Sequence, residues 1–536
     1  MSAQHNTLVT DSRLLTPSVP RPKLQGYQRV SYVQVQPQSV TSSGISFICP
    51  RRQQGLDLDR SIKIVVPIRL TLTATDVPYG SLLLNANYSN FRSWPFQRAC
   101  QRMQMFINST EFNFECAEVF TALEHLSTTM TLRNLQFSTC PTYPSGQSQS
   151  FNDLAGGNRS PLATYADSID GVPVQNYPFQ IVSQTNDALL GGVGTAITIV
   201  DMVTIEYLRF PPLYFGPLAK NYGSLRNVKD FEMNFTLQNN AGFRMISIDN
   251  VGAQLGSGTI SVTSQFQFSP ADNFSYDDKY PKLLMTYLQP EGIPIDSPEI
   301  EIPYFNIQQY KSQASAAMTG GSTSIISSND ILTPMIPTKI LVFAKKPQSV
   351  FLRDPYTPDV FCAIKTMRVV WNNQIVMDNI HPSVLYDLSQ ASGIQYEWAS
   401  WSGLGLNNAT AGSNFGKPDY QFGGIGSVAC FDVLDFGITL EQQRALSSQM
   451  YHLQMDVTVK NIATDTFTPE LFVLLLIDGC LYIAENGQAK KLDNIQNFEF
   501  SPFNPDKTYF KALKFNPGKK IDVPMLVKQG SKYKTI

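Results

Sequence analysis

The four histidines are the side chains best suited to general acid–base catalysis or zinc binding near neutral pH. They are His5, His125, His381 and His452. None stands four residues from another, the spacing that places two ligands on one face of a helix, and none lies near a pair of cysteines. We therefore interpret them as polar residues at the ends of structural elements, and we predict no metal site and no catalytic histidine.

Motifs for phosphate binding or for an activated nucleophile are also missing from the sequence. It contains no GxxxxGK[ST], no GxSxG and no dinucleotide-binding fingerprint. The glycine run at Gly191–Gly194 lacks the helix and the lysine that phosphate binding requires, so we expect a flexible loop there. The sequence therefore predicts no catalytic residue and no cofactor.

Two pairs of acids and one pair of aromatics are the remaining candidates for chemistry. A glycosidase built on a β-sandwich could use carboxylates such as Asp277 with Asp278, or Asp432 with Asp435. Trp398 and Trp401 could line a glycan site, although packing inside a loop is the commoner role for such aromatics. A tandem β-sandwich protein that binds or acts on carbohydrate therefore remains as the alternative to a protein that is not an enzyme.

Cysteine usage argues against a disulfide framework and against a zinc site. The count is odd and no CxxC spacing occurs, which favours buried free thiols. The seven are Cys49, Cys100, Cys116, Cys140, Cys362, Cys430 and Cys480.

Length and composition indicate a large globular chain. Its 536 residues exceed what one hydrophobic core usually supports, so two or more domains are expected. The net charge of -2 gives no global reason to expect binding to nucleic acid or to a membrane. No signal peptide is recognisable, and the longest apolar run, 471–477, is too short to span a membrane. We therefore expect a soluble protein made in the cytosol.

Alternation of apolar and polar residues is the dominant pattern in the chain. It is clearest over 62–74 and 231–237, where one face of a β-strand would be buried. Helical periodicity is brief and predicts only two short helices, over 116–126 and 383–389. The sequence therefore predicts an all-β protein.

Three segments of the first half recur in the same order in the second half. They are 66–74 with 336–344, 106–112 with 370–375, and 231–239 with 453–461. The second pair predicts two hairpins that turn on Asn108-Ser109 and Asn372-Asn373. The offset falls from 264 to 222 residues between the second and third pairs, which places 42 additional residues in the first half. We assign them to a long surface loop at about 140–194.

These repeats predict two tandem antiparallel domains. The first covers 44–290 and the second covers 296–488, with a long loop at about 389–425 and a Pro/Gly linker at 289–294. An arm, 1–43, would precede them, and a basic tail, 489–536, would follow. Eight strand candidates in each half, with no alternating helices, favour two jelly rolls.

Several segments of the second half resemble one known family. They are 384–386, 398–403, 424–440 and a closing hairpin over 471–483 with an Asp478-Gly479 turn. Together they resemble the second half of the double jelly-roll (hexon-like) major capsid proteins of polinton-like viruses, adintoviruses and virophages. The resemblance implies a homotrimer in which six rolls form a pseudo-hexameric block that tiles an icosahedral virion shell around a DNA genome.

The resemblance also implies partners for the termini and loops. Penton proteins and minor capsid or cement proteins would contact the shell, and the long loops could reach a host surface. Ten lysines against four acids follow Gln488, and residues 1–43 are also net positive. These termini could attract the genome or an inner membrane, or the tail could simply grip a neighbouring subunit. A receptor-binding spike would be expected to show fibrous repeats or a signal, and the sequence shows neither.

Overall fold

The structure is a computed structural model that describes most of the predicted strands. Apart from short gaps, the described residues are 27–49, 56–78, 90–116, 119–126, 179–213, 224–247, 261–268, 280–290, 299–347, 361–402, 426–436, 450–493 and 528–533.

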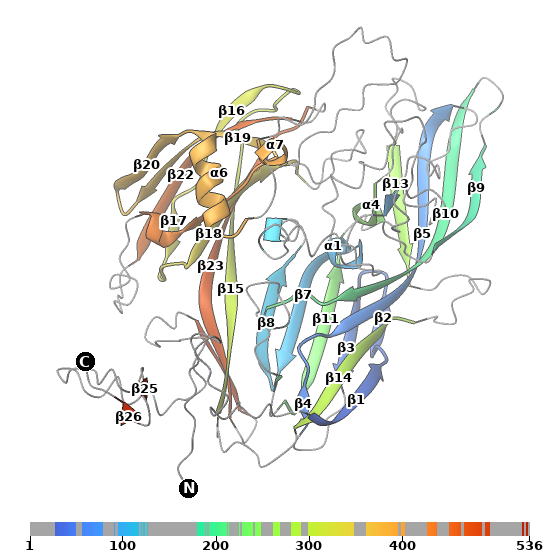
Figure 1. The fold of residues 1–536 in the computed structure, drawn as a ribbon. Helices are drawn as coiled ribbons and strands as arrows, with labels where there is room; N and C mark the ends of the chain where they lie inside the picture. Colours follow the sequence, from blue (N-terminus) through green and yellow to red (C-terminus); the bar gives the residue numbers. More distant parts are fainter. Residues whose placement is uncertain are drawn as a thin grey trace.

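The first half forms two facing antiparallel sheets (Figure 1). The first sheet contains, in spatial order, β1 (Tyr27–Val35), β14 (Lys282–Pro290), β5 (Lys63–Pro78), β10 (Val193–Tyr207) and β9 (Phe179–Asn186), with β4 (Asp57–Leu58) beside β14 and β13 (Ser261–Gln267) beside β5. The second sheet contains β2 (Ser39–Thr41), β3 (Gly44–Cys49), β11 (Phe231–Leu237), β7 (Cys100–Ile107) and β8 (Thr110–Glu115).

The second half also forms two antiparallel sheets. One contains β15 (Glu299–Gln313), β23 (Glu470–Ala484), β18 (Lys339–Lys345) and β21 (Val428–Asp432), with β24 (Ala489–Asp493) beside β23. The other contains β16 (Thr323–Ser327), β22 (Tyr451–Lys460), β19 (Ala363–Trp371) and β20 (Gln374–Ile380), with β17 (Ile331–Thr333) beside β22.

The same order of strands recurs in both halves. The path β1-β14-β5-β10 corresponds to β15-β23-β18-β21, and β3-β11-β7-β8 corresponds to β16-β22-β19-β20. Two four-stranded sheets connected in this way form a jelly roll, so the predicted double jelly roll is confirmed. We call the two halves roll 1 and roll 2.

The two predicted hairpin turns have matching backbones. Asn108 and Ser109 have φ of 45° and 67°, and Asn372 and Asn373 have φ of 47° and 63°. Two successive residues at positive φ form the tight turn whose twist suits paired strands. The Asn-rich dipeptides therefore set the register of β7 with β8 and of β19 with β20.

Alternating burial explains why these segments are strands. In β5, Ile64, Ile68 and Leu72 are fully buried, whereas Arg69 and Thr71 on the other face are partly exposed. Burying one face of each strand removes apolar area from water and stabilises the fold by about 25 cal/mol per Å². The alternation predicted over 62–74 and 231–237 is thus confirmed.

Helix α6 (Pro382–Ala391) matches the helix predicted over 383–389 and covers the edge of a sheet in roll 2. Ser389 Oγ accepts from the backbone N–H of Cys430, and Ser392 Oγ accepts from that of Asp432, each at 3.0 Å. In roll 1 the corresponding edge, β10, is paired with β9 instead. Both rolls therefore cover a strand edge that would otherwise be free to pair with another chain.

The remaining described elements are short. They are α1 (Pro95–Ala99), α4 (Gly242–Met245), α7 (Trp398–Trp401), the 3₁₀ helix η5 (Val433–Phe436), and the strand pairs β6 (Asn90–Phe91) with β12 (Ile246–Ser247) and β25 (Lys528–Gln529) with β26 (Lys532–Tyr533). No helix within the described ranges is long and apolar enough to cross a membrane.

Several predicted boundaries need correction. Residues 1–43 are not only an arm, because β1 and β2 pair with β14 and β3 of roll 1. The loop predicted over 140–194 includes β9 and the first residues of β10, and the tail predicted over 489–536 begins with β24. The apolar pattern of these strands is short or irregular, so it did not distinguish them from loops.

Other predicted segments lie partly or wholly outside the described residues. They are most of the helix over 116–126, the part of the first loop before residue 179, most of the second loop over 389–425, the linker after residue 290, and the tail between 493 and 528. Aside from the corrections above, the domain boundaries stay a prediction.

Candidate functional site at the seam between the two rolls

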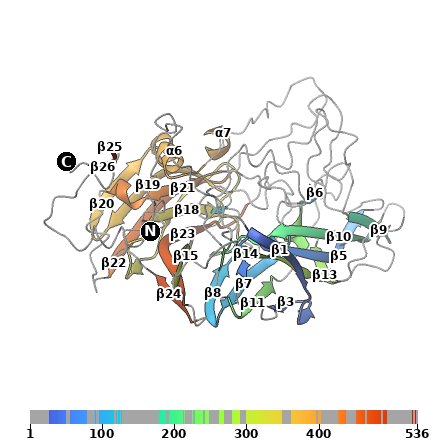
Figure 2. The ribbon, with the colours of Figure 1, turned by 60° about the horizontal axis from the view of Figure 1, so that its bottom comes forward.

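The two rolls meet where β8 of roll 1 lies against the ends of β15, β23 and β24 of roll 2 (Figures 1 and 2). We call this contact the seam. Thr110 Oγ1 donates a hydrogen bond across it to the backbone carbonyl of Ala489 at 3.0 Å. Ala489 begins β24, which pairs with β23, so this chain segment ties roll 2 to roll 1.

Aromatic packing fills the seam. The rings of Phe112 and Tyr304 meet edge to face with their centroids 5.3 Å apart. Lys491 Nζ lies 5.7 Å from the centroid of the Phe112 ring. Phe112 and Tyr304 are only 3% and 6% exposed, so the contact excludes water. An edge-to-face pair of this kind contributes about 1 kcal/mol beyond the area that it buries.

Gly479 provides the space that Tyr304 occupies. A Cβ at this position would lie 2.6 Å from Cζ of Tyr304, closer than two non-bonded carbon atoms can approach. Residues 478 and 479 do not form the predicted Asp-Gly turn, because β23 runs straight through both and pairs Gly479 with Tyr304. The glycine is explained by the close approach of a ring instead of by a turn.

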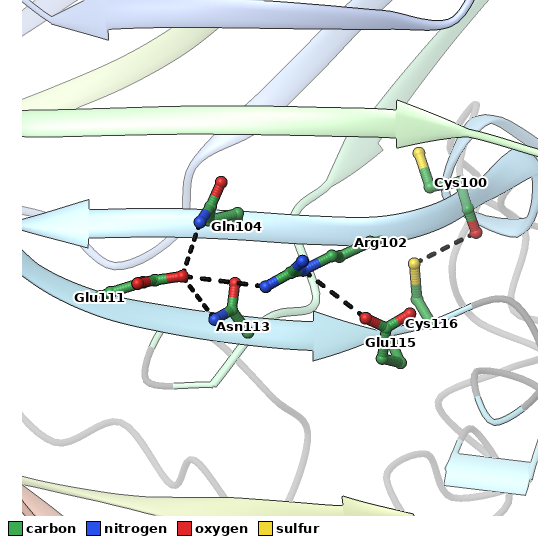
Figure 3. A network of polar contacts seen from close by, with 7 residues as sticks. All are labelled: Cys100, Arg102, Gln104, Glu111, Asn113, Glu115 and Cys116. Carbon is green, nitrogen blue, oxygen red and sulfur yellow. Dashed lines mark hydrogen bonds and ion pairs between the residues drawn. The ribbon is translucent and has the colours of Figure 1, made fainter.

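A polar network covers the exposed face of the β7–β8 hairpin (Figure 3). Glu111 Oε1 accepts from Nδ2 of Asn113 at 2.5 Å and from Nε2 of Gln104 at 2.6 Å. These two donors, and then Arg102, lower the pKa of Glu111. Arg102 also lies 3.5 Å from Glu115. Exposed ion pairs contribute little to stability, so this network mainly keeps the outer face of the hairpin charged and hydrated.

The described histidines have structural roles. His381 caps α6, since its Nδ1 accepts from the backbone N–H of Ser383. His452 Nδ1 lies 3.1 Å from Oδ2 of Asp330 at the sheet surface. His5 and His125 lie outside the described residues.

The described members of the acid and tryptophan pairs make structural contacts. Trp401 is fully buried and donates from Nε1 to the carbonyl of Val428 at 3.0 Å, and Trp398 stacks on it. Asp435 accepts from the backbone N–H of Asp432 at 3.1 Å, and burial raises the pKa of Asp435. This is the hydrogen bonding of a turn. Residues 277 and 278 lie outside the described part.

The glycine run predicted as a flexible loop lies partly within a strand. Val193 and Gly194 begin β10, and Gly191 lies outside the described residues. Among the residues that the structure describes, no group of three His, Cys, Asp or Glu side chains could hold a metal ion.

The six described cysteines are buried free thiols, as the sequence predicted, and Cys140 is not among them. Cys116 Sγ lies 3.2 Å from the carbonyl oxygen of Cys100, which it reaches as a donor (Figure 3). Burial raises the pKa of Cys362 and of Cys430 to about 12, so these thiols stay protonated and unreactive near neutral pH.

The sequence analysis singled out none of the buried acids among the described residues, which are Asp57, Asp201, Glu206 and Glu470. Glu206 of β10 is fully buried and accepts from the backbone N–H groups of Phe96 and Gln97 at 2.7 and 3.1 Å, which anchors α1 to β10. Desolvation by burial raises the pKa of Glu206 to about 7, although these hydrogen bonds lower it. The sequence signal that could have identified Glu206 is a glutamate at a position of an alternating strand that faces the core.

Glu206 makes the stability of roll 1 depend on pH. Its folded pKa of about 7 exceeds the usual unfolded value, so its stabilising contribution is complete below about pH 4.5 and is lost as the pH rises through 7. Relative to Glu206→Gln, the wild-type free energy of unfolding should fall by about 2 kcal/mol between pH 5 and pH 8. Urea unfolding of both proteins at the two pH values measures this, and a constant difference would contradict it.

Comparison with known proteins places this geometry in a family. The model of the Sputnik virophage major capsid protein 1st domain matches residues 3–275, slightly more than half of the chain. The model of the major capsid protein V20 C-terminal domain matches residues 307–479. A curated relative, the putative capsid protein V20 of Sputnik virophage, is 26% identical over 473 residues, 86% of this chain and 75% of the relative.

Solved structures agree with the fold. The Sputnik virophage structure determined by cryo-EM contains a chain that superposes with a TM-score of 0.73 at 24% identity, covering 95% of this chain and 97% of that one. The crystal structure of the mavirus major capsid protein gives a TM-score of 0.62 at 16% identity, covering 95% and 98%. The two family models, one on each roll, show that this chain belongs to the family of Sputnik-type virophage major capsid proteins.

Proposed function

We propose that this major capsid protein works as a homotrimer whose six rolls form one pseudo-hexagonal tile of an icosahedral shell around a DNA genome. The observation that carries the proposal is the seam, in which two rolls with the same strand order pack head to tail. Roll 1 contributes an edge strand, β8, and roll 2 contributes the end of its other sheet. In the described part of the chain, such a contact leaves one surface of each kind, β20 and the end of the sheet that contains β1, outside the seam.

A head-to-tail contact between like blocks either closes into a ring or continues as an open filament. Three chains of two rolls would close a ring of six blocks, with three contacts inside chains and three between them. This is the arrangement that the family resemblance implies. The exposed network on β7 and β8 suits the outer side of such a block, because it stays hydrated.

One of the ten lysines predicted in the basic tail, Lys491, belongs to β24 and lies at the seam. Lys491 lies over Phe112 of roll 1, whereas Lys490 beside it is exposed. Because this contact lies within one chain, the grip of the tail on a neighbouring subunit and its attraction for genome or membrane both stay in the proposal on the sequence alone. Contacts with penton, minor and cement proteins, and of the long loops with a host surface, are part of the proposal on the family resemblance alone.

Size-exclusion chromatography with light scattering tests the proposal at micromolar protein concentration. We expect a mass three times the 59.7 kDa of the chain, unchanged on tenfold dilution. A monomer, or a dimer that dissociates on dilution, would contradict the homotrimer.

A further inference from the structure

Roll 1 contains a part that roll 2 lacks. Strands β5 and β10 are 16 and 15 residues long, whereas their counterparts β18 and β21 have 7 and 5 residues. Strand β9 pairs with the additional length of β10, and β13 pairs with that of β5. We call β9, β13 and the segments that pair with them the extension. It lies on the side of roll 1 away from roll 2, outside the seam (Figures 1 and 2).

Strand β9 forms an open edge of the extension, since among the described residues it pairs only with β10. Proteins usually protect such edges with charged residues or proline, and β9 contains neither. Other long edge strands do carry charges, such as Arg29 on β1, Glu111 and Glu115 on β8, and Asp378 on β20. Because a strand that pairs with its own copy must not oppose like charges, the composition of β9 permits this contact.

Exposed apolar side chains lie along the same edge. The register of β9 with β10 shifts once, which makes Val182 the additional residue of a bulge, and its side chain is 41% exposed. At the tip of the β9–β10 hairpin, Leu189 and Val193 are 82% and 65% exposed. The backbone N–H of Gly192 donates to the carbonyl of Leu189 at 2.7 Å and holds both in one turn. Such side chains next to an open edge indicate a surface that a partner covers.

The bulge determines how two copies of β9 can pair. Residues Ser183–Asn186 follow the bulge and keep a regular register with β10. In an antiparallel ladder of this segment with its copy, the first residue of one segment pairs with the last residue of the other. The ladder then places Val182 of each copy beside the start of the hairpin tip that carries Leu189 in the other. The exposed apolar side chains therefore cover one another.

We propose that β9 of roll 1 pairs with β9 of a second copy of this chain across a two-fold axis, in a neighbouring tile. A two-fold contact cannot join three equivalent chains in one ring, so it links one trimer to another. This contact rests on the proposed homotrimer and names an edge through which tiles meet.

The contact belongs to roll 1 alone. In roll 2 the corresponding edge, β21, is covered by α6, because Ser389 and Ser392 accept hydrogen bonds from its backbone. A ladder as short as Ser183–Asn186 is weak when it acts singly. Its effect in a shell comes from repetition, since each trimer would contribute three such edges.

A pair of matched substitutions tests the edge. Thr185→Lys places like charges near the two-fold axis, whereas Gln265→Lys places the same charge on β13, the other uncharged edge of the extension. Both side chains are exposed. We expect sedimentation velocity of the full-length wild type, from micromolar to hundreds of micromolar, to show the trimer and, at the upper end, a species of twice its mass. Thr185→Lys should raise the dissociation constant of this species at least about tenfold, and Gln265→Lys should leave it unchanged.

Circular dichroism verifies that both variants fold, and both should remain trimers. Absence of the doubled species in the wild type, or equal weakening by the two substitutions, would overturn the β9 contact.

A photo-crosslinking amino acid at position 185 of the full-length chain identifies the partner surface at the concentration where the doubled species forms. We expect the β9 peptide to be linked to its own copy, a product that only two chains can give. Cross-links to other segments alone would overturn the β9 contact. A stable trimer without the β9 cross-link would spare the proposed function. A monomer that forms β9-linked dimers would overturn the homotrimer and keep the β9 contact, and a monomer without that link would overturn both.

Discussion

Replacing Gly479 by valine should destabilise the protein by about 2–4 kcal/mol and loosen the seam. The new Cβ would lie 2.6 Å from Cζ and 2.9 Å from Cε1 of Tyr304. The ring cannot turn aside freely, because it packs against Phe112 and is 6% exposed. Urea unfolding measures the loss. A decrease in the free energy of unfolding would point to the ring of Tyr304, since a valine in place of a strand glycine would otherwise stabilise the strand.

A double-mutant cycle shows whether the tyrosine ring is the cause. In a Tyr304→Ala background the obstructing ring is gone, so Gly479→Ala should cost little or even stabilise β23. In the wild-type background the same Gly479→Ala change should be clearly destabilising. Equal effects in the two backgrounds would show that the glycine is required for another reason.

Replacing Phe112 by alanine should both destabilise roll 1 and uncouple the two rolls. The substitution empties a buried site, which costs about 3–5 kcal/mol, and it removes the ring that meets Tyr304 and Lys491. Differential scanning calorimetry should show one cooperative transition for the wild type. For Phe112→Ala it should show two, because the substitution removes the ring through which β8 contacts roll 2.

Phe114 provides the matched control for Phe112. It lies two residues along the same strand, is 4% exposed, and packs inside roll 1 on Phe210 with centroids 5.9 Å apart. Phe114→Ala should therefore lower the stability of roll 1 by a similar amount and leave one transition. Two transitions for both variants, or one for both, would show that Phe112 has no special role in coupling.

The fold was predictable because local patterns and tertiary structure agree. Alternation over 62–74 and 231–237 required one buried face, and the Asn108-Ser109 and Asn372-Asn373 dipeptides required positive φ. These constraints act within a few residues, so each survives divergence between the two halves. The order of the repeats then fixed the same sheet order in both rolls.

The seam could not be predicted, because it depends on residues that meet only in three dimensions. Asp478-Gly479 has the composition of a turn, yet the glycine is there for the ring of Tyr304 on the paired strand. Glu206 lies at an inward position of β10, and its partners on α1 are 109 and 110 residues away. No local pattern encodes such contacts, although a glutamate at an inward position could have been flagged.

Electron cryomicroscopy of the purified protein tests most directly the claim that two like rolls are joined head to tail as one capsid tile. We expect three-fold particles in which six β-sandwiches form a ring, with the contacts inside and between chains superposing on one another. Particles without a ring of six sandwiches, or a ring whose contacts between chains involve surfaces unrelated to the seam, would contradict it.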